Sequence, residues 1–491
     1  MSVKLASNKL EWYQGGAWYD ITSSMLEGAS AEMETTGNRA NALAFGEATE
    51  PRATIPVKDV LSAAPWENIP IRLTPTLDGS TAQVFGGIIV NRSRDVASMT
   101  FECAGWAELI RKTSKSIYSP AFYRRPAATK TTATSIEDPS SGSYAGGLTN
   151  YTFWQCGGRP YEQAGSYPTA TFYYSCDQAV LAPTWSWLAG EDGWAELLKL
   201  AQASGGQVYQ GPDGVVRYRQ VLGVADLTPG ASFDESTYKS IAEKADTDQR
   251  YTKLTCAYIP REARPLQEVV NDSTFRLVHI GETITITLEP QWPLKSLEQA
   301  SAGQLKADTI TAVYLDSNVV AQGGSGYTHT LVVDAQRVTI TITNTSGKPF
   351  GIYGIKLNGE PIVAGEAGSV TVGSGTIVGS ALDGDAAVYI QSAEDGERLC
   401  QMALAFYNLT RPIYTLTDVA HDPSLDVGDV ISLTNARYGL SGVACVLLSI
   451  KLDHAGVVGE YEVSPVTGLP KASDFYIVGI NYTGQTKQLG Y

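Results

Sequence analysis

The stretch at 191–220, EDGWAELLKLAQASGGQVYQGPDGVVRYRQ, constrains the fold more than any other part of this sequence. Its first half repeats apolar residues at i, i+3, i+4 and i+7, which form one stripe of a helix: Trp194, Leu197, Leu198 and Ala201. Asp192 precedes the stripe at the position of an N-cap acceptor. The glycine pair at 205–206 supplies the positive-φ residues that end a helix. We therefore expect a helix that starts near Gly193 and stops at this pair.

The second half of the stretch predicts a β-hairpin. Gln207–Tyr209 turns through Gly-Pro-Asp-Gly at 211–214 into an alternating run that begins at Val215. A short helix and a lone hairpin are each marginally stable in water. This helix-plus-hairpin unit must therefore rest on flanking β structure.

Composition favours β structure for the rest of the chain. The 491 residues include 48 Gly, 23 Pro and 26 Tyr, which is typical of many short strands joined by turns. A chain of this length divides into roughly three or four domains. No apolar h-region follows the first residues, and no window approaches a membrane span, so we expect a soluble, non-exported protein.

The residues that usually carry chemistry are sparse and scattered. Four His occur without HxH or HExxH spacing, and six Cys occur without any CxxC. Buried free thiols are the favoured interpretation of the cysteines, although the loop between Cys156 and Cys176 could close as a disulfide. No GxSxG elbow is present, and the glycines at 365–385 lack phosphate-loop spacing. We expect no catalytic residues, no metal and no cofactor, and hence no enzyme.

The net charge of −15 opposes binding to nucleic acid, which requires clustered Lys and Arg to displace counterions from phosphates. We therefore expect no sequence-specific nucleic-acid binding.

Strand patterns divide the chain into segments. We predict a β-barrel at 1–113, an aromatic-rich insertion at 114–187 and the helix-hairpin part at 188–247. A second barrel is expected in two pieces, 248–290 and 386–465, the latter including a helix. Between these pieces, alternating runs predict an inserted β-sandwich at 291–385, whose deletion should leave the rest foldable. A polar tail with one strand fills 466–491.

The insertion at 114–187 is dense in aromatic residues and poor in charge. One interpretation is an interaction surface for sugar or a neighbouring subunit, since aromatic side chains give large contact area at low entropic cost. The other is that these rings fill a small irregular core. Candidate surface residues are Trp154, Tyr173, Tyr174, Trp185 and Trp187.

Four motifs in order resemble the tail-tip hub and minor tail proteins of long-tailed bacteriophages, especially those infecting actinobacteria. They are Trp18-Tyr-Asp-Ile-Thr, then Pro70-Ile-Arg-Leu with Val84-Phe-Gly-Gly-Ile-Ile, then Trp194-Ala-Glu-Leu-Leu with Asp213-Gly-Val-Val-Arg-Tyr, and finally Asp426-Val-Gly-Asp-Val-Ile. The resemblance implies a ring subunit that closes the tail tube, built from two related β-barrels with an α/β part between them. It also implies a homotrimer whose six barrels give a near-sixfold face.

The resemblance further implies the partners: a distal tail ring, the tape-measure protein, and tip or fibre proteins. The protein would be made in the host cytoplasm and reside at the distal end of the virion tail, with DNA passing through the ring. An alternative function is that of a tail adhesin whose inserted domains bind a host-surface glycan or protein. A glycan-binding screen of segments 114–187 and 291–385 would separate the two functions.

Overall fold

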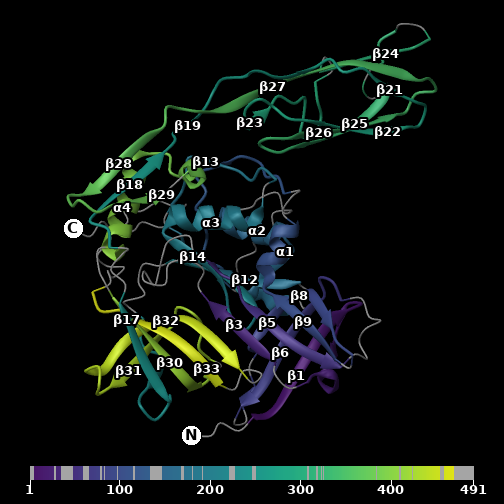
Figure 1. Cartoon of the computed structure of the whole chain (residues 1–491). Helices are drawn as coiled ribbons and strands as arrows, with labels where there is room; N and C mark the ends of the chain where they lie inside the picture. The colour runs from purple at the N-terminus through teal and green to yellow at the C-terminus, as the bar shows by residue number, and fades with distance from the viewer. Residues whose placement is uncertain are drawn as a thin grey trace.

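The computed structural model is mainly β, as the sequence predicts, with two β-barrels, an α/β layer above them and a projecting β-sandwich (Figure 1). It describes residues 5–468 apart from 27–28, 35–47, 59–65, 78–79, 82, 97, 114–116, 133–145, 167–170, 180, 191, 221–226, 246–249, 307–308, 317–318, 322, 324–325, 383, 408–410, 423 and 454–457. The strand predicted in the tail at 466–491 lies outside these residues.

The helix-plus-hairpin unit forms as predicted. Helix α3 (Gly193–Ser204) begins at Asp192, whose carboxylate accepts hydrogen bonds from the backbone N–H groups of Trp194 and Ala195 at 2.9 and 3.3 Å. Gly205, at φ 68°, ends it. Strands β14 (Gly206–Gln210) and β15 (Val215–Gln220) then pair as an antiparallel hairpin.

The hairpin lies at the centre of the α/β layer. Its sheet has the order β11-β12-β15-β14-β4, in which β12 pairs parallel to β15. Three helices cover this sheet, and their apolar side chains form one core with α4. The remaining elements of the layer are β4 (Ala48–Thr49), α1 (Trp106–Thr113), β10 (Phe122–Tyr123), α2 (Leu148–Gln155), β11 (Gly158–Pro160), β12 (Phe172–Cys176) and β13 (Trp185–Ser186).

Two parts of the predicted N-terminal barrel segment, 1–113, belong to the α/β layer. Strand β4 pairs with β14, and α1 buries Trp106 in the α/β core, where its ring stacks on Phe172. The first barrel itself is made of β1 (Leu5–Gln14), β2 (Ala17–Asp20), β3 (Ser30–Glu34), β5 (Arg52–Lys58), β6 (Pro70–Leu77), β7 (Ser80–Thr81), β8 (Phe85–Arg94) and β9 (Ser98–Ala104).

The second barrel begins earlier in the chain than predicted. Its strands are β16 (Ala231–Phe233), β17 (Ser240–Ala245), β30 (Pro412–Ala420), β31 (Val430–Asn435), β32 (Leu440–Asp453) and β33 (Val458–Pro465). The segment 248–290 contributes no strand to it, so that prediction was wrong. The alternation at Thr283–Leu288 correctly indicated a strand. Alternation shows that one face of a strand is buried, but it does not show which strands pair with it.

The two barrels are joined edge to edge. Strand β3 pairs with β5 of the first barrel on one side and with β32 of the second barrel on the other, so one sheet runs through both. The buried side chains of both barrels form one continuous core. The barrels lie side by side beneath the α/β layer (Figure 1).

A small sheet connects the α/β layer to the sandwich. Strand β18 (Lys253–Tyr258) pairs antiparallel with β28 (Gly368–Gly373) and parallel with β29 (Val378–Leu382), and α4 (Ala393–Tyr407) packs on it. The segment 365–385 therefore supplies two strands of a sheet that belongs to the α/β side of the molecule.

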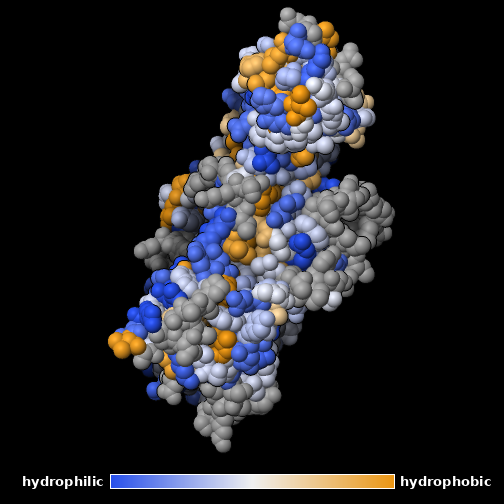
Figure 2. Space-filling model, turned by 90° about the vertical axis from the view of Figure 1, so that its right-hand side faces the viewer, coloured by the Kyte–Doolittle hydropathy of each residue, from blue (hydrophilic) through white to orange (hydrophobic). Residues whose placement is uncertain are grey.

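The inserted sandwich spans 261–364, which corrects the predicted limits 291–385. One sheet is built along the long strand β27 (Phe350–Ala364), and the other has the order β22-β26-β25. The sandwich has its own core and stands away from the body (Figures 1 and 2). Its other strands are β19 (Arg261–Ala263), β20 (Gln267–Asp272), β21 (Arg276–Val278), β22 (Thr283–Leu288), β23 (Leu294–Leu297), β24 (Ile310–Tyr314), β25 (Tyr327–Val333) and β26 (Val338–Asn344).

Candidate functional site

The five aromatic residues predicted as one interaction surface are divided among three places. Tyr174 is fully buried in the α/β core, where it stacks on Phe153 with ring centres 5.2 Å apart. Strand alternation explains this position, because β12 turns alternate side chains inward. For Tyr174 the core-filling interpretation is the correct one.

Trp154 and Tyr173 lie on one half-buried patch at the edge of the α/β sheet. The guanidinium of Arg159 lies 4.0 Å from the centre of the Trp154 ring, and Arg159 pairs in register with Tyr173. The Tyr161 ring packs edge-on against Tyr173. Neither Trp154 nor Tyr173 lines the pocket described next.

Trp185 and Trp187 line a pocket of about 340 Å³ where the sandwich joins the body; we call it the junction pocket. Trp292, from the sandwich, and Tyr389, from the turn before α4, complete its aromatic lining. Gln391 fixes the strand that carries Trp185, since its side-chain amide donates to the backbone oxygen of Trp185 at 2.6 Å and accepts from its N–H at 3.0 Å. The walls therefore come from both parts of the molecule.

The polar lining of the junction pocket carries more positive than negative charge. Glu196 on α3 accepts a hydrogen bond from the Tyr389 hydroxyl and pairs with Lys199 at 3.3 Å. Arg261, the first residue of the sandwich, lies with its guanidinium 4.4 Å from the centre of the Trp187 ring. Burial lowers the pKa of Arg261 from its usual value, an effect opposed by Tyr389. Gln336 adds a neutral amide.

Sequence reasoning found two of these residues and missed the others. Trp292, Arg261 and Tyr389 come from segments far apart in the chain, and no spacing links them to Trp187. Of these residues, Trp292 alone could have been noticed in the sequence, because it lies at the start of the segment predicted as the sandwich, 291–385.

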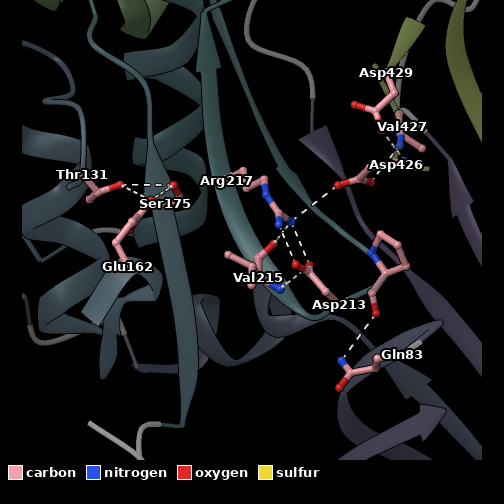
Figure 3. A network of polar contacts seen from close by, with 11 residues as sticks. Gln83, Thr131, Glu162, Ser175, Asp213, Val215, Arg217, Asp426, Val427 and Asp429 are labelled. Atoms are coloured by element: carbon pink, nitrogen blue, oxygen red, sulfur yellow. Dashed lines mark hydrogen bonds and ion pairs between the residues drawn. The ribbon is translucent and has the colours of Figure 1, made fainter. Parts of the chain in front are cut away.

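A second polar site ties the hairpin to both barrels (Figure 3). Arg217 on β15 forms a two-point ion pair with Asp213, at 2.6 and 2.8 Å, and reaches Asp426 of the second barrel at 3.5 Å. On the other side, Gln83 of the first barrel donates to the backbone oxygen of Pro212 at 3.4 Å. The hairpin turn is thus held between the barrels.

Asp426 has an unusual electrostatic position in this site. Its pKa is raised to about 7, chiefly by burial and also by Asp213 and Asp429, while Arg217 and Arg219 act in the opposite direction. Because Asp213 already neutralises Arg217 at short range, the cation offers Asp426 only a weak second interaction. The Asp213 carboxylate also raises the pKa of Arg217.

A third network, also drawn in Figure 3, lies within the α/β layer. Glu162 accepts hydrogen bonds from the hydroxyls of Thr131 and Ser175 at 3.1 and 2.5 Å. The Thr131 hydroxyl accepts in turn from the backbone N–H of Cys176 at 2.9 Å. These bonds attach the segment around Thr131 to β12 and have a structural role.

The described residues contain no cluster of three or more His, Cys, Asp or Glu arranged to hold a metal ion. All six cysteines are buried and free, so Cys156 and Cys176 are not bonded to each other. His421 is buried beside the Tyr461 hydroxyl at 2.6 Å, and burial lowers its pKa to about 4. Among the described helices, none has the length and apolar character needed to cross a bilayer.

Comparison with known proteins gives matches in structure alone. No protein-family model matches the chain, and no curated protein matches it. A 43 kDa tail protein of prophage MuSo2 from Shewanella oneidensis is 12% identical, with a TM-score of 0.43 over 93% of this chain and 98% of that chain. A tail protein from Neisseria meningitidis MC58 is 9% identical, with a TM-score of 0.43 over 94% and 98%. The E. coli c3393 protein, a type VI secretion component described as similar to T4 tail proteins gp27 and gp5, is 8% identical, with a TM-score of 0.36 over 96% and 78%.

Proposed function

We propose that this protein is a structural subunit of the tail-tip hub of a long-tailed bacteriophage, located in the virion at the distal end of the tail. In this role three copies form a ring that closes the tail tube and connects it to tip or fibre proteins. The proposal includes no catalytic activity.

The observation that carries the proposal is the pair of barrels joined through β3 and β32. One continuous sheet and one shared core fix the barrels relative to each other. Three such pairs around an axis would present six barrels, which matches the near-sixfold face implied by the sequence resemblance. A closed ring would also cover strand edges that a single subunit leaves exposed.

The α/β layer supports this role by bracing the barrels from above. The Gln210 side chain donates to the backbone oxygen of Gly86 in the first barrel at 2.5 Å and accepts from the N–H of Trp106 at 2.7 Å. Arg217 and Arg219 contact Asp426 and Val427 of the second barrel. A rigid pair of barrels is what a ring that bears the load of a tail tube requires.

The acidic charge fits a passage for DNA. A net charge of −15 disfavours strong phosphate contacts that would stall a moving polyanion. In this proposal the hub contacts the distal tail ring and the tape-measure protein on one side and tip or fibre proteins on the other.

The test is the mass of the purified chain in solution across a concentration series. We expect a species of three times the 52.5 kDa chain mass. A variant that lacks the sandwich should assemble equally, because the barrels carry the ring. A monodisperse monomer at tens of micromolar chain, with or without the sandwich, would contradict the hub assignment.

A further inference from the structure

We propose that the junction pocket binds an anionic saccharide, specifically a pyranose ring that carries one carboxylate. This inference goes beyond a structural hub role, and it differs from the adhesin alternative in placing the ligand between the sandwich and the body.

The size and lining of the pocket suit one small ligand. Its volume of about 340 Å³ lies at the lower end of the range for small-molecule sites, about 300–1,000 Å³. Trp187, Trp292 and Tyr389 offer ring faces or edges at its walls. Aromatic rings provide rigid contact area for the apolar face of a sugar at low entropic cost.

Arg261 makes the pocket selective for a negative charge. Within the described residues its guanidinium makes no hydrogen bond and no ion pair, and it lies over the face of the Trp187 ring. None of its guanidinium nitrogens is among the buried unpaired polar atoms of the described residues, so a bound carboxylate could reach them and form a two-point interaction. The ring face of Trp187 holds the guanidinium plane in place for this contact.

The remaining polar groups distinguish a carboxylated sugar from a phosphate ligand. Among the described lining residues, Lys199 and Arg261 contribute two positive charges and Glu196 one negative charge, a formal surplus of one. This surplus matches a monoanion, whereas a phosphate monoester carries nearly two negative charges at neutral pH and would be repelled by Glu196 more strongly than a carboxylate would. The Glu196 carboxylate and the Gln336 amide can instead accept hydrogen bonds from sugar hydroxyls.

A ligand in this pocket would touch both parts of the molecule. The sandwich meets the body here through a hydrogen bond from the Ala335 N–H to the Ser119 oxygen at 2.8 Å and through Arg337, which lies 3.7 Å from the centre of the Tyr118 ring. Trp292 and Gln336 are on the sandwich, whereas Trp187 and Glu196 are on the body. Binding should therefore raise the thermal stability of the whole chain by mass action.

The experiment titrates D-glucuronate into the full-length protein while following tryptophan fluorescence and the unfolding temperature, with D-glucose as the neutral probe. We expect saturable glucuronate binding, with glucose at least about ten-fold weaker, the factor expected for one charge-assisted contact. Arg261→Gln should reduce glucuronate affinity by about ten-fold and leave glucose affinity nearly unchanged. Trp187→Ala should weaken both sugars.

The matched control is Arg159→Gln, which removes a guanidinium from a tryptophan face outside the pocket. It should leave glucuronate binding unchanged, and circular dichroism should show that all three variants are folded. If Trp187→Ala does not fold, Arg261→Gln decides the outcome by itself. Absence of glucuronate binding, equal affinity for the two sugars, or wild-type binding by Arg261→Gln would each overturn the proposal. The chain mass tests the hub assignment separately, so either idea can fail without the other.

Discussion

Gly428, in the loop between β30 and β31, illustrates how one residue sets a contact between two parts of the chain. It has a φ of 88°, and a Cβ at this position would lie 1.5 Å from Nη1 of Arg219. Arg219 uses this space to donate to the Val427 oxygen at 3.2 Å and to the Gln207 side chain at 2.9 Å. The absence of a side chain at Gly428 is what lets β15 approach the second barrel.

Gly428→Ala should therefore lower the stability of the protein by more than backbone strain alone. We expect about 1–2 kcal/mol for an alanine in left-handed backbone and about 1–3 kcal/mol more for the displaced arginine bonds. The matched control is Gly439→Ala, which has a φ of 66° and nothing within 4 Å of the added Cβ. Thermal unfolding of both variants measures the difference; equal losses would show that the Arg219 contact contributes nothing.

Ionisation of Asp426 should make the folded protein less stable as pH rises. Its pKa is about 7 in the folded chain against an ordinary value of 3.8, so between these values the folded state holds a proton that the unfolded state has released. Stability from this group is present below about pH 4 and is lost as pH rises toward 7, by on the order of 1–4 kcal/mol in total. Asp426→Asn keeps an acceptor for the Val427 N–H and removes the titration.

The measurement for Asp426 is the unfolding temperature of wild type and Asp426→Asn at pH 5, 6, 7 and 8. Wild type should lose stability relative to the variant across this series. Asp20→Asn is the control, because hydrogen bonds from Thr22 lower the pKa of Asp20 and place its titration below this range. A wild type that gains stability relative to Asp426→Asn with rising pH would contradict the assigned shift.

At the scale of elements, the pairing of β18 with β28 decides where the sandwich can be removed. Tyr258 pairs with Gly368, and the Gly365 N–H donates to the Pro260 oxygen at 2.8 Å, so the chain leaves and re-enters the body at one point. Replacing 261–364 by Asn-Gly should close β18 and β28 as a hairpin. We expect a soluble variant that retains the cooperative unfolding of the body, measured by calorimetry.

The deletion of 291–385, expected from sequence to be harmless, should instead destabilise the body. It removes β28 and β29 and so uncovers Leu254 and Cys256 of β18, which are fully buried. It also leaves β20 and β21 without their partner β27. The comparison of the two deletions is a direct test of the corrected boundary; equal behaviour would contradict it.

At the scale of the whole molecule, the charge of the chain predicts weak interaction with DNA. With a net charge of −15, the protein should bind a labelled duplex with a dissociation constant weaker than about 100 µM at physiological salt. Fluorescence anisotropy over a salt series measures this. Tight binding that weakens steeply with salt would contradict a passive passage and favour a role that grips DNA.

The sequence alone determined the features that depend on residues close together in the chain. The N-cap at Asp192, the left-handed Gly205 and the hairpin at 211–214 are set by residues within a few positions of one another, and all form as predicted. The mainly β class follows in the same way from strand alternation and turn residues.

Only the tertiary structure decided which elements meet. Alternation at Thr283–Leu288 specified a strand with one buried face but not its partner, so the segment was assigned to the second barrel and lies in the sandwich. Burial likewise separated Tyr174 from Trp187, and folding brought Arg261 and Trp292 to the latter across long intervals of chain. The junction pocket exists because two folded parts meet there, and contacts between distant segments leave no periodic signal in a single sequence.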